Sequence, residues 1–179
     1  MQYGYRELEV AEPFAEGFVQ DPEFCRWVIE QTPFASSASS VRLMHEEMRA
    51  RRSSTAGSWW RSYWTRKCGC GTCQPDRETD LLAIFETQGA FRFALHVEVK
   101  NSKDIFKRGG LQAEAYRKRA ACWAQCAPRT VLPHNAAATV LLCGESKRNE
   151  FPAEAAEFDS VITLEAVLAR FPNFYPPAL

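Results

Sequence analysis

The sequence of 179 residues contains no apolar run that approaches the ~20 residues needed by a membrane-spanning helix. Its N-terminus, MQYGYRELEV, lacks the basic start and the apolar segment of a secretory signal peptide. Internal repeats and long linkers are missing as well, and the length fits one domain over residues 1–179 with a sizeable core. We therefore expect a single-domain cytoplasmic protein with no membrane segment.

An excess of either charge is also absent, because 22 Lys and Arg residues balance 22 Asp and Glu residues. The distribution along the chain is uneven, however. Residues 1–41 carry seven acidic and two basic side chains, whereas residues 42–67 carry seven basic and two acidic ones. A near-neutral protein can still bind phosphate if its cations gather on one face, so the overall charge does not exclude nucleic acid as a partner.

Cysteine is present in an odd number, seven, and three of the seven lie in Cys68-Gly-Cys70-Gly-Thr-Cys73. This pattern fits reduced thiols or a metal site in the cytoplasm better than a secreted disulfide scaffold. The glycines between the thiols would let a loop wrap around a tetrahedral ion such as a structural Zn²⁺. Three ligands are one too few, and the fourth could come from His45, Cys122 or Cys126. Cysteines without a metal are the alternative.

The hydrophobic periodicity changes along the chain between helical and strand-like spacing. Expected helices cover residues 5–33 (with a break near Asp21-Pro22), 41–52, 111–125 and 164–171. Expected strands cover residues 81–86, 91–100, 138–143 and 161–162. This order predicts an α/β fold with a central mixed β-sheet flanked by α-helices. Within the domain we expect an N-terminal helical segment (about 1–52) and a cysteine-containing loop (about 53–77).

A hairpin with its turn at Gly89 would join the first two strands. In that register Asp80 faces Glu98, and Glu78 faces Lys100, all on one face because side chains alternate along a strand. The reverse face is wholly apolar and must be covered by helices. The apolar residues on the reverse face are Leu81, Ala83, Phe85, Phe93, Leu95 and Val97.

Two facing carboxylates repel each other unless a cation lies between them. Carboxylate oxygens are the ligands that Mg²⁺ prefers, together with phosphate oxygens of a substrate. Lys100 lies two residues after Glu98, on the same side of the strand, where it could orient an attacking water or stabilise charge on phosphorus. The alternative is a solvated strand edge with an incidental acid opposite.

Asp80, then Glu98-Val99-Lys100, then a helix with Gln112 and Tyr116, resembles the PD-(D/E)xK nuclease superfamily. The resemblance implies a restriction-endonuclease-like core and hydrolysis of nucleic-acid phosphodiesters with Mg²⁺ or Mn²⁺. It implies that Asp80 and Glu98 are metal ligands and that Lys100 is the catalytic lysine. The literal dipeptide Pro75-Asp76 also precedes Glu-x-Lys, but its register position lies beyond the catalytic pair, so Asp76 is the second choice.

Two further features are shared with members of the superfamily. Gln112-Ala-Glu-Ala-Tyr116 matches a Gln-x-x-x-Tyr helix that borders the metal site in several branches. Many members also place a glutamate of the first core helix near the metals. Here Glu47 is favoured over Glu46 because it lies nearer the buried stripe of the expected helix over residues 41–52.

Basic residues on both sides of the hairpin are candidates for contact with nucleic acid. They are Arg61, Arg66 and Lys67, within an aromatic run that could instead anchor a loop on the core, and Lys103 and Lys107 after the second strand. DNA is the expected substrate and RNA stays open, with a homodimer or a larger complex as the expected setting. The alternatives are a non-catalytic binding module with a zinc loop, and a zinc or redox protein.

Overall fold

A computed structural model of the protein describes residues 5–52, 57–64, 68, 70, 73, 78–106 and 111–174. Its centre is a five-stranded sheet in the order β1-β4-β5-β6-β7, formed by Val41–Leu43, Leu81–Thr87, Arg92–Lys100, Ala136–Cys143 and Ser160–Thr163. The pairs β1–β4 and β4–β5 are antiparallel, while β5–β6 and β6–β7 are parallel. A small antiparallel pair, β2 (Tyr63–Trp64) and β3 (Glu78–Thr79), lies beside it. The predicted α/β class with a mixed sheet is confirmed.

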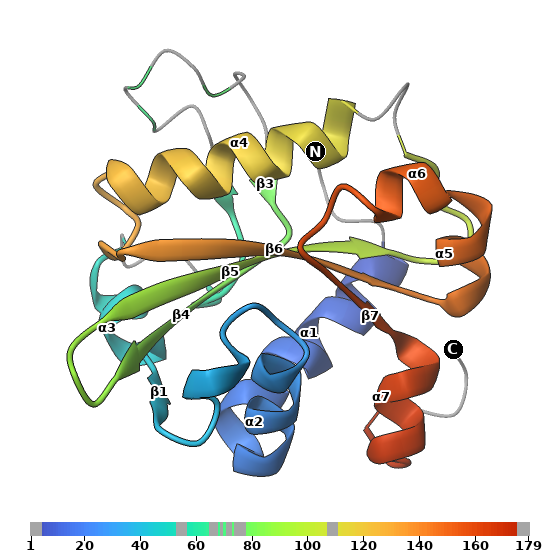
Figure 1. The fold of residues 1–179 in the computed structure, drawn as a ribbon, viewed down its shortest axis with the longest axis horizontal. Coiled ribbons are helices and arrows are strands. Elements are labelled where there is room, and N and C mark those ends of the chain that lie inside the picture. The colour runs from blue at the N-terminus through green and yellow to red at the C-terminus, as the bar shows by residue number, and fades with distance from the viewer. Residues whose placement is uncertain are drawn as a thin grey trace.

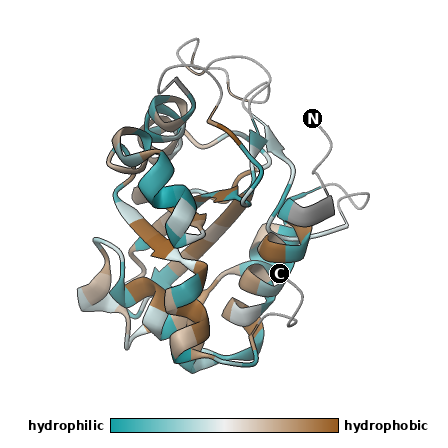
Figure 2. Ribbon diagram, turned by 90° about the vertical axis from the view of Figure 1, so that its right-hand side faces the viewer, coloured by the Kyte–Doolittle hydropathy of each residue, from teal (hydrophilic) through white to brown (hydrophobic). Residues whose placement is uncertain are grey.

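Helices cover both faces of the sheet (Figure 1). The longer ones are α1 (Tyr5–Gln20), α2 (Pro22–Glu30), α4 (Leu111–Gln125) and α7 (Leu164–Arg170), and the shorter ones are α3 (His45–Ala50), α5 (Glu145–Glu150), α6 (Pro152–Ala155) and the 3₁₀ turn η1 (Ala35–Ser37). The Phe18 ring of α1 packs 5.4 Å from Phe85 of β4, and Trp123 of α4 packs 5.3 Å from His96 of β5, measured between ring centroids. Figure 2 shows the apolar strands enclosed between these helices.

The hairpin between β4 and β5 has the predicted register. Leu81 pairs with Val97, and Phe85 pairs with Phe93. Ala90 in the connecting turn adopts a positive φ of 59°, and its N–H donates to the Thr87 carbonyl at 3.0 Å. The apolar face is covered by helices, as predicted. The opposite face is covered as well, with α4 lying over β5, and both strands are buried on two sides.

The expected break near Asp21-Pro22 is also present. Asp21 caps α2, because its Oδ1 accepts the N–H groups of Glu23 and Phe24 at 2.9 and 3.1 Å. Pro22 occupies the first turn, where its missing N–H costs no helical hydrogen bond. The aromatic rings of Phe24 and Phe171 then pack 5.3 Å apart and join α7 to α2.

The expected helix over residues 41–52 is wrong at its start. Val41–Leu43 forms the edge strand β1, and α3 begins only at His45. The reason is tertiary, since β1 supplies the partner that the outer edge of β4 needs, and Met44 N–H donates to the Ile84 carbonyl at 2.8 Å. In the part of the chain that the structure describes, no helix combines the length and the apolar character needed to cross a bilayer.

Candidate active site

The acidic residues of the hairpin meet at the end of β5 that adjoins the start of α4. Asp80 lies one residue before β4, and its Oδ2 accepts the Val99 N–H at 2.9 Å. Glu98 Oε1 accepts hydrogen bonds from both Lys100 Nζ and Gln112 Nε2. Glu98 and Lys100 are 1% and 5% exposed, so the ion pair between them is buried. The sequence-predicted group Asp80, Glu98, Lys100 and Gln112 is therefore brought together.

Helix α4 supplies a second contact to this group through Tyr116. The Tyr116 hydroxyl accepts the Asp80 N–H at 3.0 Å and lies 3.5 Å from the Val97 carbonyl oxygen. Burial first, and the charges of Asp80 and Glu98 second, raise the pKa of Tyr116 well above its usual value. The phenol thus stays protonated and fixes the backbone just before β4 to β5.

Two acids that the sequence argument missed complete the group, Glu7 in the first turn of α1 and Asp104 after β5. Their side chains are hydrogen-bonded to each other, and Glu7 also lies within electrostatic reach of Lys100 and Glu98. No local pattern marks Glu7 as a site residue. The surplus of acidic residues in the N-terminal segment was the available signal, but it does not show which of them reaches the sheet.

Acidic side chains outnumber basic ones in this group. Burial first, and the Glu98 carboxylate second, raise the pKa of Asp80 well above its usual value. Burial first, and Asp104 second, raise the pKa of Glu7 to about 7. For Lys100, burial lowers the pKa, but Glu98 and Asp80 outweigh that effect and the net direction is upward. One protonated lysine therefore faces several carboxyl groups, a distribution that favours binding of a further cation.

The donor set fits a hard divalent cation such as Mg²⁺. Glu98 Oε2 and Gln112 Oε1 are buried acceptor oxygens with no hydrogen-bond donor among the residues that the structure describes. Buried acceptors without a partner are costly, so a cation, an ordered water or a proton shared with Asp80 would be favourable beside them. Asp80 and Glu98 supply the carboxylate oxygens that such an ion prefers.

Two of the expected neighbours of this group lie elsewhere. The ladder between β4 and β5 begins only at the pair Leu81–Val97, and Glu78 belongs to β3, where it pairs with Trp64 of β2 instead of Lys100. Glu47 is not near the other acids either, and the expectation that it borders the metal site is wrong. Its carboxylate lies 2.7 Å from Arg42, whose guanidinium is 3.3 Å from Glu86 at the far end of β4.

This position of Glu47 has a simple structural cause. Once Val41–Leu43 forms an edge strand against the end of β4 next to the hairpin turn, α3 must begin at that end of the sheet. A strand rises about 3.3 Å per residue, so Glu86 lies about 20 Å along β4 from the Asp80 end. The pKa of Glu47 is lowered, chiefly by the hydrogen bond from Arg42. A lowered carboxyl pKa of this kind is typical of an ordinary surface ion pair.

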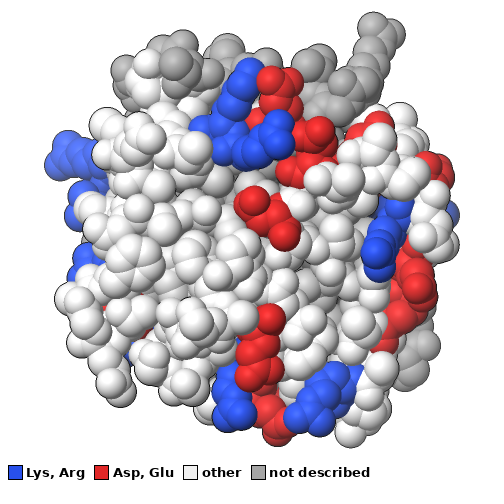
Figure 3. All heavy atoms as spheres, in the orientation of Figure 1, with Lys and Arg blue, Asp and Glu red and all other residues white. Residues whose placement is uncertain are grey.

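Of the candidate nucleic-acid contacts, Arg61 and Lys103 are described by the structure. Lys103 is exposed in the turn after β5, and Arg61 is partly exposed with its guanidinium 5.9 Å from the Trp60 ring. Arg66, Lys67 and Lys107 lie outside the described residues, as does Asp76. On the face seen in Figure 3, some Lys and Arg side chains lie beside acidic ones and others lie among uncharged residues at the left edge.

The aromatic run before the cysteines anchors its segment on the core. Trp59, Trp60 and Tyr63 are 5%, 3% and 2% exposed, and the Tyr63 hydroxyl donates to the Trp59 carbonyl at 2.8 Å. Rings buried to this extent cannot stack on bases. The alternative that the sequence left open, a loop held on the core by its aromatics, is the observed one.

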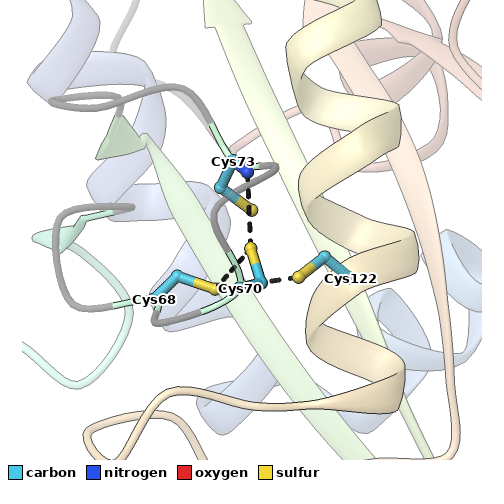
Figure 4. Close-up of side chains that lie close together, drawn as sticks. All are labelled: Cys68, Cys70, Cys73 and Cys122. Carbon is cyan, nitrogen blue, oxygen red and sulfur yellow. Dashed lines mark hydrogen bonds between the residues drawn. The ribbon is translucent and has the colours of Figure 1, made fainter.

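Four cysteines form a cluster next to α4 (Figure 4). The sulfur atoms of Cys68, Cys70, Cys73 and Cys122 all lie within 4.8 Å of one another. Cys122, on α4, is thus the fourth member, while Cys126 is exposed and His45 packs against Trp59. The cluster has the composition of a site that can bind a metal such as Zn²⁺.

A hollow of about 690 Å³ lies between α2 and β1, far from the acidic group, with Phe18, Trp27 and Val41 in its lining. None of the residues described above as a possible metal ligand lines it. The hollow and the acidic group therefore lie in different parts of the molecule. Because titratable groups with perturbed pKa values are characteristic of functional sites, we take the acidic group at the end of β5 as the candidate site.

Comparison of the chain with protein-family models, with curated proteins and with solved structures finds no match. The function therefore has to be inferred from the geometry and the chemistry of the chain's own residues.

Proposed function

We propose that the protein is a metal-dependent nuclease that hydrolyses phosphodiester bonds, in DNA first of all, with the PD-(D/E)xK arrangement of a restriction-endonuclease-like core. The observation that carries the proposal is the meeting of Asp80, Glu98, Lys100 and Gln112 at one end of the hairpin. Asp80, whose pKa is raised, lies beside the buried Glu98–Lys100 pair, and such an arrangement is more characteristic of a functional site than of a packed core.

Asp80 and Glu98 are the residues that would hold Mg²⁺ or Mn²⁺. When bound, such an ion neutralises charge that develops on a phosphoryl group. The remaining residues have roles that follow from their contacts. Gln112 fixes the Glu98 carboxylate through its amide, and Tyr116 fixes the backbone that presents Asp80.

Lys100 acts as a cation and not as a base in this proposal. Its raised pKa keeps the ammonium protonated at neutral pH, so it cannot take a proton from water. It can donate hydrogen bonds and stabilise negative charge on phosphorus, an effect that is strong where water is excluded. Lys100 Nζ lies 5.4 Å from the centroid of the Phe106 ring, and this apolar neighbour helps to exclude water from the ammonium group.

A second candidate function is a binding module without catalysis. It is favoured by one observation, the near-complete burial of Glu98 and Lys100, which restricts access of a phosphate to both side chains. Asp80, Glu7 and Gln112 are partly exposed, and they are the members of the group through which a substrate would be reached.

The test is cleavage of supercoiled plasmid and of single-stranded DNA with Mg²⁺ or Mn²⁺. We expect Lys100→Ala to reduce the rate by at least about 100-fold, the usual effect of removing one group that stabilises transition-state charge. Lys118→Ala is the matched control, because Lys118 is exposed on α4 and pairs with Glu114. Equal rates for the wild type and Lys100→Ala would contradict the assignment. DNA binding with no cleavage by the wild type would support the binding module.

A further inference from the structure

The cysteine cluster has the spacing of a mononuclear metal site. Cys68 Sγ lies 3.2 Å from Cys70 Sγ and 3.7 Å from Cys122 Sγ. Four thiolates around one Zn²⁺, each about 2.3 Å from the ion, stand about 3.8 Å from one another. A disulfide would need about 2.05 Å between sulfur atoms, so the observed separations belong to neighbouring, unbonded sulfurs.

The local backbone is also suited to a metal site. Cys70-Gly-Thr-Cys73 places two thiols at the Cys-x-x-Cys spacing of many zinc sites. The Cys73 N–H donates to Cys70 Sγ at 3.3 Å, a hydrogen bond of the kind that orients a thiolate ligand and tempers its charge. Figure 4 shows the four side chains converging from the loop on one side and from α4 on the other.

We propose that Cys68, Cys70, Cys73 and Cys122 bind one Zn²⁺, and that this ion clamps the cysteine loop to α4. Four thiolates fill the tetrahedral shell and leave no open position, which is the arrangement of a structural site and not of a catalytic one. Among the described residues, no other group of three or more Cys, His, Asp or Glu side chains has ligand atoms this close together.

The clamp connects two segments that position the candidate active site. The cysteine loop leads through β3 to Asp80, and α4 carries Gln112 and Tyr116 toward its N-terminus. Glycine-containing loops have a large conformational entropy, which a bound ion would offset. Zinc would thus hold the chain before Asp80 against the helix that contacts Asp80 and Glu98. The metal site itself does not depend on whether the protein is a nuclease.

The first experiment measures metal content and ligand type in the full-length protein. We expect about one Zn²⁺ per chain, and Co²⁺ exchanged into the site should give the visible bands of a tetrahedral ion with intense thiolate charge transfer in the near ultraviolet. Cys122→Ser should lower Zn²⁺ affinity by at least about 100-fold, more than is typical for loss of an outer-shell partner. Cys126→Ser, a change close by in sequence but outside the cluster, should bind Zn²⁺ like the wild type.

A second measurement covers the case in which Cys122→Ser does not fold. In the zinc-loaded wild type, an alkylating reagent should modify exposed Cys126 quickly, while the four cluster thiols react only after Zn²⁺ is removed with a chelator. Wild-type protein that fails to retain Zn²⁺ from an equimolar solution would overturn the proposal. So would equal protection of the cluster thiols with and without the chelator, or a bound iron in place of zinc. The Lys100→Ala variant should keep its zinc whatever the outcome of the cleavage assay.

Discussion

In the proposed site, Asp80 is the residue at which function and stability would conflict most directly. Its carboxylate is surrounded by protein and lies beside Glu98, and these two effects raise its pKa. The ionised form therefore costs stability at neutral pH in the absence of a cation. The Val99 N–H offsets part of that cost through its hydrogen bond to Oδ2. A destabilising side chain of this kind is expected where ligand binding, and not folding stability, determines which amino acid occupies the position.

Asp80→Asn should therefore stabilise the metal-free protein and abolish metal-dependent cleavage. The asparagine Oδ1 can keep the hydrogen bond from Val99, while the repulsion from Glu98 disappears. We expect a gain of about 1–2 kcal/mol in the free energy of unfolding, measured by urea denaturation with a chelator present. A variant that is less stable than the wild type, or that still cleaves DNA with Mg²⁺, would contradict this view of the site.

At the level of elements, the site is an intersection of β5, α4 and the first turn of α1. Glu7 reaches it from α1, where the helix dipole alone would favour the ionised carboxylate. Burial and the negative charge of Asp104 nevertheless raise its pKa to about 7. The folded protein thus holds a proton on Glu7 between about pH 4.5 and 7, where the unfolded chain has released it. The contribution of Glu7 to stability is therefore present below about pH 4.5 and is lost as the pH rises to 7.

Glu7→Gln should remove the loss of stability that Glu7 causes as the pH rises. With a chelator present, we expect the variant to gain about 1–2 kcal/mol on the wild type between pH 4.5 and 8, less than the full shift implies because Glu7 is partly exposed and solvent screens its charge. The measurement is the free energy of unfolding as a function of pH. Glu12→Gln, an exposed position of the same helix, should follow the wild type. Parallel curves for wild type and Glu7→Gln would show that Glu7 is not coupled to the acidic group.

The elements also show what can be predicted from local pattern and what cannot. The hairpin register was predictable because one turn and strict alternation fix every pair from Leu81 to Glu86. The strand at Val41–Leu43 was not, since Val41, Met44 and Met48 also fit helical spacing, and only the free edge of β4 selects a strand there. Glu7 and Cys122 became site residues through the packing of α1 and α4, which no short-range pattern contains.

For the whole molecule, balanced charge would limit how DNA is bound in the proposed function. With a formal net charge of zero, attraction to DNA depends on the few cations near the site and not on a general field. Among the described residues, Lys103 follows β5 directly and is exposed. Each phosphate that a cation neutralises contributes about −0.9 to the slope of log K against log salt concentration. We therefore expect a shallow slope of about −2 to −4 for a short duplex.

Lys103→Ala should make this slope less negative by about 1, since one phosphate contact is lost, and should weaken binding equally for unrelated sequences. The slope is measured by fluorescence anisotropy of a labelled duplex at several salt concentrations. All variants in this experiment also carry Asp80→Asn, so that the DNA is not cleaved. Lys118→Ala, which removes an exposed cation paired with Glu114 on α4, should leave the slope unchanged. If the two lysine variants change the slope equally, the DNA does not approach along the end of β5. Its path would then lie over another face, and the catalytic geometry would have to be assigned anew from that face.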